Sequence, residues 1–104
     1  MPLIQKIREH RLVPLFYHDD ITVCKKVLDT VIKCGLPLLE FTNRGPKAMG
    51  NFKQLVIHLG NDTGFSLGVG SVKTDDEAKM FIDLGASFIV SPFLDKSIAK
   101  VCVK

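Results

Sequence analysis

Short apolar segments alternate with longer amphipathic segments along this chain. Each apolar segment has the length of a strand, and most are flanked by Gly, Pro, Asp or Asn. Their apolarity is nearly continuous, which is typical of parallel strands buried on both faces. The four segments are 12–17, 36–41, 65–70 and 87–92. The pattern therefore predicts four parallel strands.

The segments between these predicted strands have helical periodicity and recognisable helix ends. Helices are predicted in 19–35, 45–60 and 74–85, after a short leading helix and before a final helical stretch that contains KSIAK. Asp19 or Asp20 can cap the first of the three, and Gly35 can close it. Thr74 and Glu77 have the spacing of a capping box at the start of the third.

A leading helix followed by four β-then-α units implies parallel strands joined by right-handed crossovers. Two architectures have this order, a small open α/β sheet and part of a (β/α)8 barrel. The 104 residues suffice for one domain and are too few for two ordinary ones. We therefore predict a single domain over residues 1–104.

Polar side chains follow the predicted strands at their carboxyl ends, where ligands bind in both architectures. Glu40, Thr42 and Arg44 occupy alternate positions, so they share one wall for as far as the strand continues. A carboxylate and a guanidinium in that arrangement can carry protons and bind an anion. Alternatively, Glu40 and Arg44 pair with each other or with neighbouring charges and only tie the strand to its loop.

The third and fourth predicted strands end in small residues. The segment GVGSV allows close approach of the backbone to a ligand and offers Ser71 as a donor, but glycine at a barrel corner explains it equally well. It lacks the spacing of a dinucleotide fingerprint or a P-loop. The fourth predicted strand ends in Ser91 and Pro92, where a proline can simply end the strand. Of the histidines, only His18 lies at this rim, where a capping or solvent-facing role is more usual than catalysis.

The amino-acid composition limits the classes of protein to which this chain can belong. Apolar residues make up 46% and charged residues 24%, as in soluble globular proteins. Fourteen basic against eleven acidic residues give a net charge of only +3, and the basic residues are scattered, so binding of nucleic acid is not indicated. The amino terminus has no long apolar core, which predicts neither a signal peptide nor a membrane span. The three cysteines lack disulfide or zinc spacing, and we expect buried thiols of a cytoplasmic protein.

In this order and at these separations, the segments VPLFY, LLEFTNR, LGVGSV and GASFIVSPF resemble the first half of the 2-keto-3-deoxy-6-phosphogluconate aldolase family. Members of that family often also cleave 4-hydroxy-2-oxoglutarate. The resemblance implies a (β/α)8 barrel, of which this chain supplies about the first four β/α units after a short helix. It also implies a class I aldolase, which forms a Schiff base between a lysine and the keto carbon of pyruvate or of the substrate and needs no cofactor and no metal ion.

The resemblance also implies roles for particular residues. Glu40 matches the family's general acid and base, and Arg44 matches the arginine that binds the carboxylate of the pyruvate portion. Ser71 matches a hydroxyl residue that helps to hold pyruvate, and Pro92 matches a proline that lines the same pocket. Thr42, in the same segment as Glu40, completes the predicted substrate-binding set.

The family's Schiff-base lysine lies on the sixth strand, and its phosphate-binding loops come late in the barrel. No lysine here matches that nucleophile by motif, so we expect an amino-terminal half or truncated version of the aldolase that is inactive alone. The expected ligand is a small 2-keto acid, whether phosphorylated or not, and homo-oligomers are expected because the family commonly forms trimers. The alternative is a non-catalytic α/β module that binds an anionic metabolite or a partner subunit.

Overall fold

The chain alternates helices and strands in the predicted order. The computed structural model describes residues 1–61 and 64–103. Its helices are α1 (Leu3–His10), α2 (Ile21–Lys33), α3 (Ala48–Leu59), α4 (Asp75–Leu84) and α5 (Lys96–Cys102), and its strands are β1 (Leu15–Phe16), β2 (Leu38–Thr42) and β3 (Ser66–Gly70).

The strands form one parallel sheet in the order β1-β2-β3. The predicted strand at 12–17 shortens to β1, and the predicted strand at 87–92 reduces to a single bridge between Ile89 and Val69. Both lie at edges of the sheet, where within the described residues each has a strand partner on one side only. Fewer backbone hydrogen bonds therefore hold these two segments in extended form.

The helix ends follow the chemistry expected from the sequence. Asp20 Oδ1 accepts a hydrogen bond from the backbone N–H of Thr22 at 2.8 Å at the start of α2. Thr74 Oγ1 accepts one from the N–H of Glu77 at 3.1 Å at the start of α4. Gly85 ends α4 with φ 114°, a left-handed conformation that glycine adopts without steric cost. The capping predictions for these two helices are confirmed.

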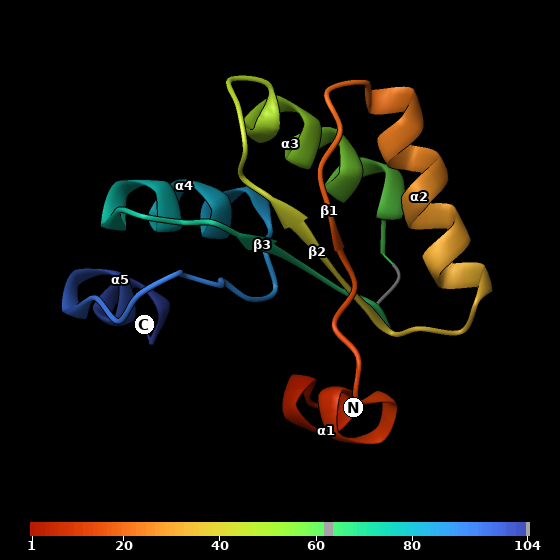
Figure 1. Cartoon of the computed structure of the whole chain (residues 1–104), viewed down its shortest axis with the longest axis horizontal. Helices are drawn as coiled ribbons and strands as arrows, with labels where there is room; N and C mark the ends of the chain where they lie inside the picture. The colour runs from red at the N-terminus through yellow and green to blue at the C-terminus, as the bar shows by residue number, and fades with distance from the viewer. Residues whose placement is uncertain (62–63, 104) are drawn as a thin grey trace.

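Helices α2, α3 and α4 pack against one face of the sheet, and α5 packs against α4. The apolar core joins the buried side chains of alternate strand positions to those of the helices, namely Leu39, Phe41, Leu67 and Val69 with Cys24, Leu28, Phe52, Leu55, Phe81 and Ile98. Leu38 is fully buried yet lies outside that cluster, as expected for a residue on the opposite, inner face. Figure 1 shows α2, α3 and α4 following one another around the sheet. A doubly wound sheet carries helices on both faces, so sequential strand order with helices on one face indicates part of a barrel wall.

Helix α1 lies next to the amino ends of the strands, at the opposite end of the sheet from their carboxyl ends (Figure 1). Its Lys6 is only 4% exposed. The Lys6 ammonium donates to the carbonyl of Gly64 at 3.0 Å and to Ser66 Oγ at 2.8 Å. Because Ser66 is the first residue of β3, this buried lysine fastens α1 to the start of the sheet.

Replacement of Lys6 by alanine is expected to destabilise the fold by about 2 kcal/mol, because it removes charge-assisted hydrogen bonds from a buried site. Urea denaturation followed by circular dichroism measures the change. Lys53→Ala is the matched control, since Lys53 is an exposed lysine on α3 and its loss should change the free energy of unfolding by less than about 0.5 kcal/mol. Equal effects of the two substitutions would contradict the fastening role of Lys6.

The cysteines only partly follow the prediction of burial. Cys24 on α2 is fully buried, whereas Cys34 and Cys102 are exposed, and all three are free thiols. Cys34 caps the end of α2 and Cys102 ends α5, and helix ends protrude from the packed layer. The prediction was therefore wrong for these two residues. None of the helices in the described ranges is long and apolar enough to cross a membrane.

Candidate active site

Glu40 lies on the inner face of β2, two residues before the strand ends. It is only 7% exposed. Its carboxylate lies across Gly70 of β3, since a Cβ placed on Gly70 would overlap Glu40 Oε2. In the sheet register Glu40 is opposite Gly68 and Thr42 is opposite Gly70. Gly70 thus leaves the space that the Glu40 carboxylate fills on the inner wall, whereas a Cβ on Gly68 would overlap the ring of Phe88.

The Glu40 carboxylate has no hydrogen-bond or ion-pair partner within the residues that the structure describes. Burial therefore acts on it unopposed and raises the pKa of the Glu40 carboxyl. The alternative in which Glu40 and Arg44 pair only to tie strand to loop is not observed, because the ion pair within the described ranges joins His58 and Asp29. A buried carboxyl without a charged partner is typical of an acid/base group.

The raised pKa of the Glu40 carboxyl predicts how the free energy of unfolding depends on pH. The folded protein holds the Glu40 proton to higher pH than the unfolded chain does, so ionisation of this group costs stability as the pH rises through the folded-state pKa. Glu40→Gln mimics the protonated form and should be more stable than the wild type at neutral pH. The difference should shrink at mildly acidic pH. Urea unfolding of both proteins at the two pH values measures it, and a glutamine variant that is less stable at neutral pH would contradict the burial argument.

Arg44 lies beyond the end of β2. The strand ends at Thr42, so the alternation that places Glu40 and Thr42 on one wall does not extend to Arg44. Arg44 is exposed and belongs to the segment 43–47, which we call the Arg44 loop. The N–H of Asn43 donates to the carbonyl of Gly70 at 2.8 Å, and that of Ala48 donates to the carbonyl of Gly45 at 3.1 Å. The strand alternation therefore does not set the direction of the Arg44 side chain.

Three hydroxyl groups lie at the same rim. Thr42 is 3% exposed, and its buried Oγ1 has no hydrogen-bond partner in the described chain, nor has the buried Oγ of Ser91. Ser71 has φ 58°, a left-handed conformation that costs energy in a residue with a side chain. Unpaired buried hydroxyls and local strain are both features of ligand sites. Ser91 was not in the predicted site, because SP was interpreted as the end of a strand.

Pro92 is exposed and follows the bridge at Ile89. The N–H of Val72 donates to the carbonyl of Val90 at 3.3 Å. This hydrogen bond places the segment that carries Ser91 and Pro92 beside the turn that carries Ser71. The structure therefore brings Glu40, Thr42, Ser71 and the segment around Pro92 to one rim, and it leaves Arg44 on the adjoining loop.

The polar residues after β1 have structural partners. Tyr17 Oη donates to Asp19 Oδ1, and this hydrogen bond raises the pKa of Tyr17 to about 12. The Tyr17 ring packs on Phe41 with ring centroids 5.4 Å apart. His18 Nδ1 accepts from the N–H of Asp20 at 2.9 Å, which agrees with the capping role considered for it. The polar side chains of Tyr17 and His18 therefore stabilise the loop that follows β1.

The sequence model of the KDPG and KHG aldolases, the enzymes of 2-keto-3-deoxy-6-phosphogluconate and 4-hydroxy-2-oxoglutarate, matches residues 3–104. The chain belongs to this aldolase family. A 2-dehydro-3-deoxy-phosphogluconate aldolase of Haemophilus influenzae is 31% identical over 100 residues, which are 96% of this chain and 46% of that protein.

Solved structures of the family share the fold. A 4-hydroxy-2-oxoglutarate aldolase/2-deydro-3-deoxyphosphogluconate aldolase from TTHB1 is 28% identical with a TM-score of 0.77, over 99% of this chain and 49% of that one. The 2-keto-3-deoxy-6-phosphogluconate aldolase of Zymomonas mobilis ZM4, solved with 3-phosphoglycerate, is 27% identical with a TM-score of 0.74, over 88% and 42%. This aldolase-family chain thus spans about half the length of its relatives and has the form of a half barrel, about four β/α units of a (β/α)8 fold.

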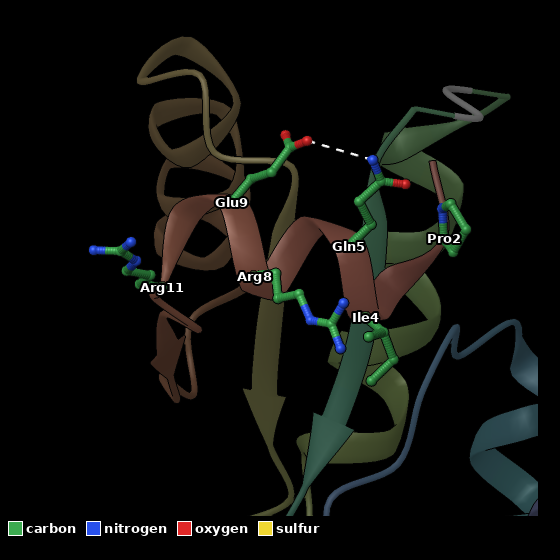
Figure 2. A pocket seen from close by; sticks show the side chains of 6 residues that line it. All are labelled: Pro2, Ile4, Gln5, Arg8, Glu9 and Arg11. Atoms are coloured by element: carbon green, nitrogen blue, oxygen red, sulfur yellow. Dashed lines mark hydrogen bonds between the residues drawn. The ribbon is translucent and has the colours of Figure 1, made fainter.

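A surface hollow of this aldolase-family chain lies far from the rim, on the exposed side of α1. Its lining residues are Pro2, Ile4, Gln5, Arg8, Glu9 and Arg11, shown in Figure 2. Within it, Gln5 Nε2 donates to Glu9 Oε1 at 3.4 Å, one helical turn away. Because α1 lies at the starts of the strands, this hollow is at the opposite end of the sheet from Glu40 and contains none of the predicted site residues.

Proposed function

We propose that this chain carries the acid–base and carboxylate-binding half of a class I pyruvate aldolase site. The observation that carries the proposal is the Glu40 carboxyl, which is buried on the inner wall toward the carboxyl ends of the strands and has no partner among residues 1–61 and 64–103. Barrel enzymes place their catalytic groups at this end. The buried hydroxyls of Thr42 and Ser91, which have no hydrogen-bond partner within the described residues, support a small polar ligand at this rim.

The proposed reaction cleaves a 2-keto-4-hydroxy acid into pyruvate and an aldehyde. A lysine amine condenses with the keto carbon, with loss of water, to give a protonated Schiff base. The electron pair of the breaking carbon–carbon bond passes into this Schiff base as an enamine, and after the carbon has been protonated, water hydrolyses the Schiff base and releases pyruvate and the lysine. Glu40 takes the proton of the 4-hydroxyl group as the carbon–carbon bond breaks and returns a proton to the carbon that becomes the pyruvate methyl group. Burial raises the pKa of the Glu40 carboxyl, which makes it a better proton acceptor than an exposed glutamate.

Other residues of the chain hold the substrate in this proposal. Arg44 binds the carboxylate of the pyruvate portion through paired hydrogen bonds, and Ser71 and Thr42 donate to the same portion. Pro92 lines the pocket. The Schiff-base lysine comes from the barrel half that is not in this chain, so the chain alone has no aldolase activity. We further propose a cytoplasmic protein that acts as a homo-oligomer, with a phosphorylated or an unphosphorylated substrate.

Completion of the barrel tests the proposal. The chain is mixed with, or joined to, the second half of the Haemophilus influenzae relative, and pyruvate release from 2-keto-3-deoxy-6-phosphogluconate and from 4-hydroxy-2-oxoglutarate is followed with lactate dehydrogenase. Turnover by the combined halves, with none by either half, supports the proposal. Borohydride trapping of pyruvate followed by intact-mass analysis locates the nucleophile. An adduct on the 104-residue chain itself would contradict the assignment of that lysine to the other half.

Arg44→Ala in the completed barrel is expected to raise the KM for the keto acid by roughly 10- to 100-fold, because a charge-assisted contact of about 1.5–3 kcal/mol is lost. Arg44→Lys should recover only part of the loss, since a lysine cannot make the paired contact. Steady-state kinetics measure both effects. Lys47→Ala, an exposed cation in the same loop, is the matched control, and an equal effect of that change would contradict the role of Arg44.

A further inference from the structure

The Glu77 carboxylate joins two loops that carry different residues of the proposed site. Glu77 Oε2 accepts a hydrogen bond from Asn43 Nδ2 at 3.2 Å, in the Arg44 loop after β2. Glu77 Oε1 accepts one from the backbone N–H of Lys73 at 2.9 Å, in the segment 71–73 after β3, which we call the Ser71 turn. One side chain on α4 therefore bonds to the neighbours of both Arg44 and Ser71.

Capping of α4 does not account for both contacts. In a capping box, Thr74 Oγ1 accepts from the N–H of Glu77, as it does here at 3.1 Å, and the glutamate returns to the N–H at the start of the same helix. One carboxylate oxygen is enough for this second hydrogen bond of the box. Here Glu77 Oε1 makes it with the N–H of Lys73, one residue before the N-cap residue Thr74. The second oxygen reaches a different loop, 34 residues away in sequence, where it contributes nothing to the cap.

The loop that Glu77 reaches is otherwise held by few contacts. The N–H of Asn43 donates to the carbonyl of Gly70, which joins the loop to the end of β3. On its other side Gly45 lies against Tyr17, since a Cβ on Gly45 would come within 3.2 Å of Tyr17 Oη. Arg44 itself is exposed and unpaired within the described residues. A free arginine binds an anion well only if its loop is already in place, because ordering it on binding costs free energy.

We propose that Glu77 is a positioning residue that locks the Arg44 loop to the Ser71 turn, and so sets where the carboxylate of the ligand binds. Glu77 does not touch the ligand in this proposal. Its importance for binding rests on the proposed function, whereas the lock between the loops is a property of the chain itself.

Amide hydrogen exchange of the 104-residue chain tests the lock without any ligand. Glu77→Ala should speed exchange at least tenfold at Lys73, whose N–H loses its acceptor, and also at Asn43 and Ala48 in and after the Arg44 loop. Thr74→Ala is the matched control, because it removes the other half of the cap but leaves both carboxylate contacts, and it should speed exchange at Glu77 only. Faster exchange at Lys73 without a change at Asn43 and Ala48 would overturn the proposal and leave Glu77 as a helix cap.

Swapping the carboxylate and the amide between positions 43 and 77 tests the contact to Asn43 directly. Asn43→Asp sets two carboxylates against each other and should loosen the Arg44 loop by the same exchange measurement. Adding Glu77→Gln restores a hydrogen bond with its direction reversed, so the double variant should return to within about threefold of the wild-type exchange rates. A double variant as loose as Asn43→Asp alone would count against a direct lock.

Titration of the same proteins with pyruvate, followed by amide chemical shifts, separates the lock from the proposed function. The wild type and the double variant should respond alike, Thr74→Ala should respond like the wild type, and Asn43→Asp should bind roughly tenfold more weakly. A wild-type chain that does not respond to pyruvate would contradict the proposed function, while the exchange rates still decide the lock. A pyruvate response that is unchanged in Asn43→Asp, despite a loosened loop, would overturn the positioning role.

Discussion

Glu40→Gln is expected to reduce pyruvate release by the completed barrel by about 10²- to 10⁴-fold, which is the usual contribution of a general acid or base. Glutamine has nearly the same shape and fits the same buried space, but it can neither accept nor return the proton. The loss should therefore fall on kcat, with little change in KM. Steady-state kinetics with 2-keto-3-deoxy-6-phosphogluconate measure it.

Glu9→Gln provides the matched control for this chemical change. Glu9 lies on α1 at the opposite end of the sheet, and within the described part of the chain its side chain accepts a hydrogen bond from Gln5 alone. Its replacement should leave kcat within about twofold of the wild type, because surface changes far from the site have small effects. Turnover of Glu40→Gln within tenfold of the wild type would exclude Glu40 as the proton carrier.

Gly70→Ala is expected to lower kcat of the completed barrel by about 100-fold without unfolding the chain. The new methyl group would overlap Glu40 Oε2 and must displace the carboxylate by about 1 Å or more, and a shift of that size in a catalytic group costs about two orders of magnitude. The obstacle is the end of a flexible side chain, and Gly70 does not have a positive φ, so the backbone accepts alanine. The free energy of unfolding should change by less than about 1.5 kcal/mol.

Gly50→Ala is the control for the Gly70 substitution. Gly50 lies within α3, and no atom lies within 4 Å of an added Cβ. Alanine there should stabilise the protein by roughly 0.5–1 kcal/mol and leave kcat unchanged. A ¹³C titration of the Glu40 carboxyl gives a second measurement, because a carboxylate pushed toward solvent should have a lower pKa than in the wild type. Normal turnover of Gly70→Ala together with an unchanged Glu40 pKa would contradict the contact.

The two predictions share a physical cause. Glu40 is placed where burial raises its pKa, and the free energy lost by ionising it there is not recovered by an ion pair within the described residues. A site that only stabilised the fold would pair or remove this charge. The predicted stability gain of Glu40→Gln at neutral pH and its predicted loss of turnover are therefore opposite consequences of one buried carboxyl.

Local patterns were sufficient for much of the fold. The positions of the helices, their caps at Asp20 and Thr74, and the central strands β2 and β3 follow from periodicity and capping chemistry, which act between residues close in sequence. The edge segments were overpredicted because the sequence does not show how many partners a strand has. The exposure of Cys34 and Cys102 was missed for a similar reason, since thiol chemistry does not indicate where a helix end protrudes.

The sequence alone determined which polar groups stand at the carboxyl ends of the strands, because a parallel β/α order sends all those ends to one rim. The pattern left the role of Glu40 open between a proton carrier and a structural charge, and the resemblance to the aldolase family gave it the acid–base role. Only the tertiary structure placed the Glu40 carboxylate across Gly70, put Arg44 outside the strand alternation and joined Asn43 to Glu77. These are contacts between strands and loops far apart in the chain, and packing decides them, because no local preference specifies which loop a side chain will reach.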